Sequence, residues 1–264
     1  MWTPANSPGN PEPPTEPAVA LKEIRPDIVQ VTMQDRVSKN TFSDAIIAGL
    51  VDAFAKIRAN TNYKVVILTG FDTYFCTGGT QEALLALQKG GERNFTDVSI
   101  TYQLAFDCPV PVIAAMQGHG IGGGFVMGLY ADFVILSRES VYSTNFMKYG
   151  FTPGVGATYI VPKKLGIALG AELLISANNY RGAELEKRGI PFPVLPRAEV
   201  MEYAYRLAET IAEKPRISLV ILKEHLIAPL RKELAVVIPQ EVAMHELTLH
   251  QPEVKAKIQA LFGQ

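Results

Sequence analysis

The amino-acid sequence predicts an α/β protein with an open, largely parallel sheet and a helical C-terminal region. Short β-branched and aliphatic runs alternate with longer segments of helical apolar spacing. Parallel strands need long crossover connections, and helices usually supply them. From about Tyr203 onward the pattern is helical throughout.

Each predicted element has its own sequence pattern. IVQVTMQ, which starts at Ile28, alternates as a half-buried strand does, and residues 44–59 have the apolar spacing of a helix. Buried strands are predicted at residues 64–70, 110–116 and 133–137. The helices expected in the tail cover residues 203–212, 217–226, 234–250 and 252–262.

Composition and charge exclude several classes of protein. The chain has 264 residues, 48% of them hydrophobic and 19% charged, so it can bury a large core. Its net charge of −1 gives no general attraction to nucleic acid or to an anionic membrane. The longest uncharged run, residues 108–131, contains prolines, glycines, Gln117 and His119. We therefore expect a buried strand, turn and helix there rather than a membrane span.

The N-terminus and the cysteines bear on the compartment. Residues 1–18 are rich in proline and lack the basic and apolar segments of a secretory signal, so we expect a disordered leader. Cys76 and Cys108 are too few and too far apart for a disulfide framework, and the four histidines lack metal-site spacing. These features predict a cytoplasmic protein with no metal site.

Two glycine-rich turns are the strongest local features. GHGIGGGF, residues 118–125, stands between an apolar strand and a helical stretch, and FCTGGTQ, residues 75–81, follows the preceding strand. Read alone, the first turn fits the GxGxxG pattern of a dinucleotide site, with Glu139 as ribose-binding acid, or merely permits tight packing. Because two such turns can aim backbone N–H groups at one oxygen, the pair favours an oxyanion hole.

Longer motifs carry a family resemblance. VVILTG, FCTGG, PVIAAMQGHGIGGGF, ADFVILS and YGFTPGVGAT resemble the enoyl-CoA hydratase/isomerase (crotonase) superfamily in order and spacing, over residues 28–262. The resemblance implies a crotonase-type spiral of ββα units over residues 19–200. It also implies a C-terminal helical trimerisation region, residues 201–264, through which copies form a homotrimer or hexamer.

The resemblance further implies how the substrate is held. In this family two backbone N–H groups bind the oxygen of an acyl thioester, and their positions here are Gly79 and Gly123. Such hydrogen bonds strengthen as the oxygen becomes an enolate. Hydratases add two glutamates, whose positions here are Val126 and Phe146. Neither can transfer a proton, so hydration is not expected, whereas an apolar wall favours loss of a carboxylate as CO₂.

A narrower resemblance implies one activity. MQGHGIGGGF, ESVYSTNFMKYGFTPGVGAT, NNYRGAELEKRGIPF and HELTLHQPE are similar to segments of the decarboxylases of polyketide β-branching. Those enzymes convert 3-methylglutaconyl-acyl carrier protein to 3-methylcrotonyl-acyl carrier protein. The resemblance therefore implies a carbon–carbon lyase that needs no cofactor beyond the phosphopantetheine arm of an acyl carrier protein or of coenzyme A.

The same resemblance identifies catalytic candidates. In these decarboxylases a histidine on a C-terminal helix reaches the substrate carboxylate, and its position here is His245, whereas His250 lies on a different helical face. The family's lysine and tyrosine after the first glycine turn correspond to Leu87 and Ala83, which we expect to line the acyl pocket. Lys89 could supply the missing amine from a shifted helix end.

Smaller roles are expected elsewhere. Tyr142 and Asn145 are predicted to add polar contacts to the acyl pocket. We expect His119 to pack beneath its turn and Cys76 to be a small buried apolar group. Basic residues that could steer an acidic carrier protein are Lys163, Lys164, Arg181, Lys187 and Arg188.

Several functions stay open on the sequence alone. An enoyl thioester isomerase would use the same oxyanion hole and would need His245 or Lys89 as its base. A hydratase and a non-catalytic thioester-binding subunit of a synthase are less expected but also stay open. The sequence does not distinguish a carrier protein from coenzyme A as the carrier, or a trimer from a hexamer.

Overall fold

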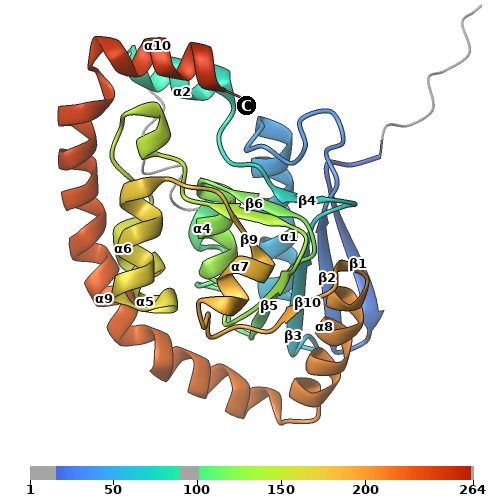
Figure 1. Cartoon of the computed structure of the whole chain (residues 1–264). Coiled ribbons are helices and arrows are strands. Elements are labelled where there is room, and N and C mark those ends of the chain that lie inside the picture. The colour runs from blue at the N-terminus through green and yellow to red at the C-terminus, as the bar shows by residue number, and fades with distance from the viewer. Residues whose placement is uncertain (1–15, 90–100, 263–264) are drawn as a thin grey trace, which may run out of the picture.

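Two mixed β-sheets organise the chain (Figure 1). The computed structural model describes residues 16–89 and 101–262. The strands are β1 Val19–Arg25, β2 Ile28–Met33, β3 Val65–Thr69, β4 Tyr74–Cys76, β5 Val112–Met116, β6 His119–Ile121, β7 Phe133–Ser137, β8 Val141–Ser143, β9 Tyr180–Arg181 and β10 Val194–Leu195. The larger sheet has the order β1-β2-β3-β5-β7-β10 and the smaller one β4-β6-β8-β9. Neighbours run parallel except in the pairs β1–β2 and β8–β9.

Helices connect the strands and cover the sheets. They are α1 Asp44–Ala59, α2 Gln81–Gln88, α4 Gly123–Leu129, the 3-10 helix η1 Met147–Tyr149, α5 Ala157–Leu165, α6 Ile167–Ser176, α7 Gly182–Lys187, α8 Arg197–Ala212, α9 Arg216–Leu249 and α10 Pro252–Leu261. α1 matches its predicted range, and Ser43 begins it by accepting a hydrogen bond from the Ile46 N–H.

Three successive strand pairs have the same arrangement. In β3–β4, β5–β6 and β7–β8, the first strand joins the larger sheet and the second joins the smaller one. α2 follows the first pair, α4 the second, and η1 with α5 the third. This repeat confirms the predicted spiral of ββα units, and it brings the carboxyl ends of β4 and β6 together.

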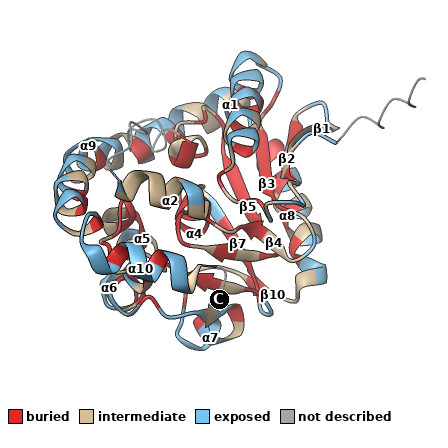
Figure 2. Ribbon diagram, turned by 90° about the horizontal axis from the view of Figure 1, so that it is seen from above, coloured by how far each residue is buried: buried red, intermediate tan, exposed pale blue. Residues whose placement is uncertain are grey.

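The strands predicted from apolar runs are confirmed as β2, β3, β5 and β7. In β3, Val65 and Ile67 pack toward α8. Val66 and Leu68 pack into the main core on the other face, so the strand is buried on both sides (Figure 2). Residues 108–131 contain β5, β6 and α4, as expected, and none of the described helices is long and apolar enough to cross a membrane.

The edges of the core differ from expectation. β1, which pairs antiparallel with β2, was not predicted, because VALKEIR mixes charged and apolar residues. Residues 1–15 of the expected leader lie outside the described residues. α8 begins at Arg197, before the expected boundary after residue 200, and its Val200 and Ala204 pack on the larger sheet. α8 is therefore part of the core, and α9 is the first helix beyond it.

The prediction of two helices at residues 217–226 and 234–250 is wrong, because α9 is one helix of 34 residues. Pro229 and Pro239 lie inside it. Each proline removes a backbone hydrogen bond and bends the helix, but buried side chains on both sides keep it packed. Figure 1 shows α9 changing direction as it passes around the core to the neighbourhood of α2 and α10.

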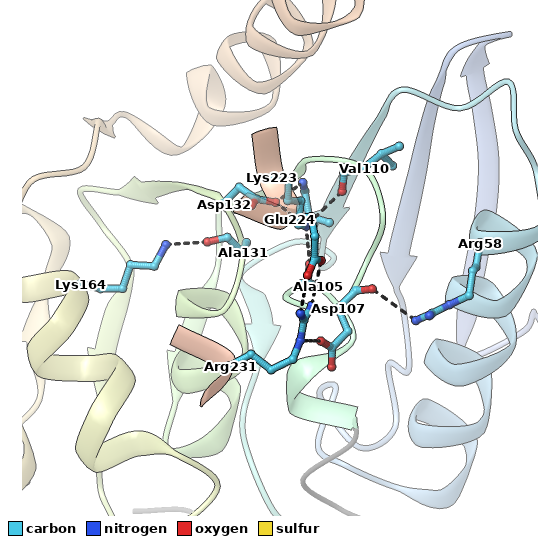
Figure 3. A network of polar contacts seen from close by, with 11 residues as sticks. Arg58, Ala105, Asp107, Val110, Ala131, Asp132, Lys164, Lys223, Glu224 and Arg231 are labelled. Carbon is cyan, nitrogen blue, oxygen red and sulfur yellow. Dashed lines mark hydrogen bonds and ion pairs between the residues drawn. The ribbon is translucent and has the colours of Figure 1, made fainter. Parts of the chain in front are cut away.

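A buried cation fastens the first half of α9 to the core (Figure 3). The Lys223 Nζ lies 2.7 Å from an Asp132 carboxylate oxygen and donates to the carbonyls of Ala105 and Val110 at 2.9 and 3.1 Å. That Asp132 oxygen also accepts the Val112 N–H at 2.7 Å. The Lys223 side chain is 3% exposed, so the ammonium exchanges its water shell for protein oxygens.

We predict that Lys223→Ala lowers the free energy of unfolding by about 3 kcal/mol, because it removes the ammonium that neutralises a partly buried carboxylate and donates to two carbonyls. Lys56→Ala is the matched control, since Lys56 pairs with Asp52 on the surface of α1, where both side chains are more than half exposed. This control should change stability by less than about 1 kcal/mol. Urea unfolding measures both, and equal effects would contradict the prediction.

Candidate active site

A cavity of about 510 Å³ lies where the two glycine turns, α2, η1 and the end of α9 meet. The turns contribute backbone amides to its lining, and α2 and the segment after β8 contribute apolar side chains. Residues from distant parts of the chain, such as Thr41, Phe151 and Phe262, close its walls. Pockets that bind small molecules commonly have this size.

The two turns touch through their backbones. β4 and β6 are parallel neighbours, with Cys76 opposite Gly120, so the turns that follow them meet at the same edge of the sheet. Gly78 has φ +84°, and a Cβ there would lie 2.7 Å from the Ile121 carbonyl oxygen and 3.6 Å from the Gly123 nitrogen. A side chain at residue 78 would therefore force the turns apart.

Gly79, from the first glycine turn, and Gly123, from the second, both line the cavity. Gly123 is the first residue of α4, and neither of the two N–H groups donates to another described residue. Amides in this state need a ligand or water as acceptor. Two of them at adjacent turns can stabilise negative charge that develops on one bound oxygen.

The far end of the cavity is apolar. Phe146, Phe151 and Val155 line it, and the Phe146 and Phe151 rings stand 6.3 Å apart at 68°. Among the described residues that line the cavity there is no aspartate or glutamate. The paired carboxylates that water addition needs are therefore missing from this wall. Val126, which we expected here, is fully buried in the main core instead, because α4 turns its side chain away from the cavity.

His245 lies at this apolar end, which Lys148 and Tyr149 also line. It lines the cavity beside Gly154, is 4% exposed, and meets the Phe151 ring edge to face at 5.2 Å. Burial lowers the pKa of His245 from 6.5 to about 4, although a hydrogen bond with the Thr152 backbone and the charge of Glu246 act in the opposite direction. The imidazole is therefore neutral at physiological pH while the cavity is empty.

Glu241 fixes the part of α9 that carries His245, one helical turn later. Its carboxylate accepts the N–H groups of Gly156 and Thr158 at 2.6 and 2.7 Å and also the Thr158 hydroxyl. These donors lie at the N-terminus of α5, so the carboxylate caps that helix and ties it to α9. Burial raises the pKa of Glu241 despite these hydrogen bonds. No feature of the sequence indicated this role, because a glutamate on a long helix is usually solvated.

Only some of the other residues predicted for the pocket line the cavity. Ala83, Leu87 and Asn145 line the cavity. Tyr142 does not: its ring is fully buried, and its hydroxyl donates to the Met116 carbonyl at 2.7 Å beneath the turn. Lys89 is exposed at the C-terminal end of α2 and is not part of the cavity wall, because α2 ends at Gln88 without turning the amine inward.

The two remaining candidate histidines and Cys76 have different surroundings. His119 was expected to pack beneath its turn, but it lines the cavity, where its Nδ1 accepts the Val141 N–H at 2.9 Å. Burial, then Arg197 and Arg181, lower its pKa. His250 is exposed and lies outside the cavity lining. Its ring nitrogens form hydrogen bonds with the Gln88 carbonyl and with the Glu246 carboxylate. Cys76 is buried, as expected, and burial raises its pKa to about 12, so its thiol is inert.

Sequence reasoning missed several lining residues. They include Tyr102 and Lys39, which both line the cavity. Tyr149 also lines it and belongs to the FMKYGFTPG segment, which was expected to shape the pocket wall. Tyr102 and Lys39 lie outside the motifs that suggested the family, so no local signal marked them. The described residues contain no cluster of three or more histidine, cysteine, aspartate or glutamate side chains placed to bind a metal ion.

Comparisons with known proteins bear on this arrangement. The Enoyl-CoA hydratase/isomerase family profile matches residues 23–262. The bacillaene synthase decarboxylase PksI of Bacillus subtilis (strain 168) is 63% identical over 249 residues, which cover 94% of this chain and 99% of that protein. A structure from a dehydratase/decarboxylase couple of polyketide β-branching is 63% identical, with a TM-score of 0.92 over 94% of this chain and 100% of the other. The ECH2 decarboxylase domain of CurF from Lyngbya majuscula is 47% identical, with a TM-score of 0.88 over 92% of this chain and 99% of that chain.

We predict that His245 and His250 differ in charge at about pH 5.5 in the empty protein. The pKa of His245 is about 4, whereas the Gln88 carbonyl, with help from Glu246, raises that of His250 above 6.5. A group with a lowered pKa takes up its proton only at lower pH, so His245 stays neutral while His250 is protonated. Imidazole 15N shifts, assigned with His245→Gln and His250→Gln, report both states. A protonated His245 at that pH would contradict the prediction.

Proposed function

We propose a substrate and a mechanism from the premise that this chain belongs to the enoyl-CoA hydratase/isomerase family and is a decarboxylase of polyketide β-branching. The substrate is 3-methylglutaconyl thioester on an acyl carrier protein, and the product is the 3-methylcrotonyl thioester. The observation that supports this choice is the cavity itself, which combines the two turn amides with an apolar wall and, at that wall, the neutral imidazole of His245.

The first step breaks the bond to the carboxyl carbon. The thioester oxygen binds the N–H groups of Gly79 and Gly123, and the carboxylate lies at the apolar end near Phe146 and Phe151. As CO₂ leaves, the two bonding electrons pass through the conjugated double bond to the thioester oxygen and give a dienolate. The two amides stabilise this charge more than that of the ground state, and each such donor is worth about 3 kcal/mol.

The second step returns a proton to carbon. A carboxylate bound beside His245 raises the pKa of the imidazole, because the negative charge favours its protonated form. After CO₂ has left, the imidazolium gives its proton to the terminal carbon of the dienolate, which becomes a methyl group. Glu241 keeps α9 in register for this transfer through its bonds to Gly156 and Thr158.

We further propose that the carrier docks at the polar entrance of the cavity. Ser38, Lys39 and Asn179 line it together with His119, and an ammonium there suits a phosphate or an acidic carrier protein. Lys164 donates to the Ala131 carbonyl. Arg188 forms two short bonds to Glu172. Of the basic residues named from the sequence, we choose Arg181 because Asn179, two residues before it, lines the cavity, although the Arg181 guanidinium also donates to the Glu139 carbonyl at 3.1 Å.

A homotrimer or hexamer is proposed for the assembly. The large apolar side chains Ile167, Ile175, Ile217, Ile221, Leu222, Leu226 and Leu247 are more than half exposed on α6 and α9. Apolar surface of this extent is usually covered by another protein. The cytoplasm is the proposed compartment, supported by two buried free cysteines.

We predict that the double variant Ile221→Glu, Leu222→Glu breaks the assembly, because two charges would replace apolar contacts. Sedimentation velocity should then show a monomer in place of three or six chains. Glu209→Lys changes an exposed charge on α8 and is the matched control, for which no change is expected. A wild-type protein that sediments as a monomer would contradict the proposed assembly.

We predict that the protein removes one CO₂ from 3-methylglutaconyl-acyl carrier protein, measured by intact mass spectrometry. His245→Gln should lower the rate at least about 100-fold, because it removes the proton donor. His250→Gln is the matched control and should keep the wild-type rate. An added water would instead indicate a hydratase, a shifted double bond without mass change an isomerase, and no reaction a binding subunit. Each of these outcomes would contradict the proposed function.

A further inference from the structure

Tyr102 places a phenol beside one of the two turn amides. The side chain is 6% exposed, yet it lines the cavity. Its oxygen lies 2.4 Å from the point that a Cβ on Gly123 would occupy. Because the amide nitrogen and that Cβ position share one Cα, the hydroxyl is within roughly 5 Å of the Gly123 nitrogen. The ring is held from the other side by Phe42, at a centroid distance of 4.6 Å.

The hydroxyl of Tyr102 is unpartnered in the described part of the chain: no residue there donates to it or accepts from it. Buried tyrosine hydroxyls normally have a hydrogen-bond partner, as those of Tyr130 and Tyr142 do here with backbone carbonyls. A hydroxyl that lacks one while facing a ligand cavity is completed by the ligand. Its position over Gly123 indicates which ligand atom that is.

We propose that the Tyr102 hydroxyl donates a third hydrogen bond to the thioester oxygen that the Gly79 and Gly123 amides bind. This proposal rests on the decarboxylase mechanism above. The phenol acts as a donor and not as an acid, because burial raises its pKa far above neutrality and it keeps its proton. As the oxygen gains charge on the way to the dienolate, the bond shortens and strengthens, so its effect falls on the chemical step.

The proposal also explains why residue 123 must lack a side chain. A Cβ at residue 123 would meet the Tyr102 oxygen at 2.4 Å and ring carbons at 2.6 and 2.9 Å. Any larger residue would push the phenol away from the amide. The glycine therefore serves both donors: it exposes its own N–H and admits the hydroxyl.

Tyr102→Phe tests the proposal, since it removes the hydroxyl and keeps the ring that packs on Phe42. We expect kcat for CO₂ release to fall about 100-fold, as for other single oxyanion donors, with KM changed less than about threefold. Tyr63→Phe is the matched control: Tyr63 is also buried, at 8% exposed, but lies outside the cavity. It should keep the wild-type kcat. Replacing Tyr102 by 3-fluorotyrosine, which retains the hydroxyl, should retain most of the activity.

A spectroscopic readout separates a donor from a packing residue. The 13C shift of a labelled 3-methylcrotonyl thioester carbonyl should move downfield on binding to the wild type, and this movement should be smaller with Tyr102→Phe. Wild-type kcat together with an unchanged carbonyl shift in Tyr102→Phe would overturn the proposal. A wild type that releases no CO₂ would instead overturn the proposed reaction, and the carbonyl shift would still decide the role of Tyr102.

Discussion

The parallel pairing of β4 with β6 is the contact on which the rest of the site depends. It sets the two glycine turns against each other so closely that a Cβ at Gly124 would lie 2.1 Å from the Cys76 carbonyl oxygen. The donors that face the cavity are therefore backbone amides whose positions the sheet determines, with little freedom to reorganise during reaction. Tyr102 adds to this arrangement through the space that Gly123 leaves open.

Burial controls the chemistry at the other end of the cavity. Around His245 the low polarity that favours release of CO₂ also keeps the imidazole neutral until a carboxylate arrives. In the proposed mechanism the substrate carboxylate, which leaves as CO₂, first favours protonation of His245. That proton then takes the place of the carboxylate on the terminal carbon. The histidine reaches this place on a bent 34-residue helix, which the buried side chains of Lys223 and Glu241 fasten to the core.

Much of the fold could be predicted from sequence, because strands buried on both faces appear as continuous apolar runs and glycine turns have few conformational options. The placement of Gly79, Gly123 and His245 around one cavity was predictable, because backbone shape or the family motif determines it, and their catalytic roles stay predictions. It was not predictable where tertiary packing decides. No local sequence pattern marks Tyr102 or Glu241 as part of the site. Tyr102 approaches Gly123, and Glu241 approaches α5, only in the folded chain. The errors at Val126 and Lys89 have the same origin, since motif alignment does not give the direction of a side chain.

The most direct test of the oxyanion hole is a crystal structure with a stable 3-methylcrotonyl thioester mimic bound in the cavity. We expect its carbonyl oxygen to lie about 2.7–3.1 Å from the nitrogens of both Gly79 and Gly123. The branched end of the acyl group should then point toward Phe151 and His245. A carbonyl oxygen bound by side chains or water, with both amides left unoccupied, would contradict the central claim that these two turns form the oxyanion hole.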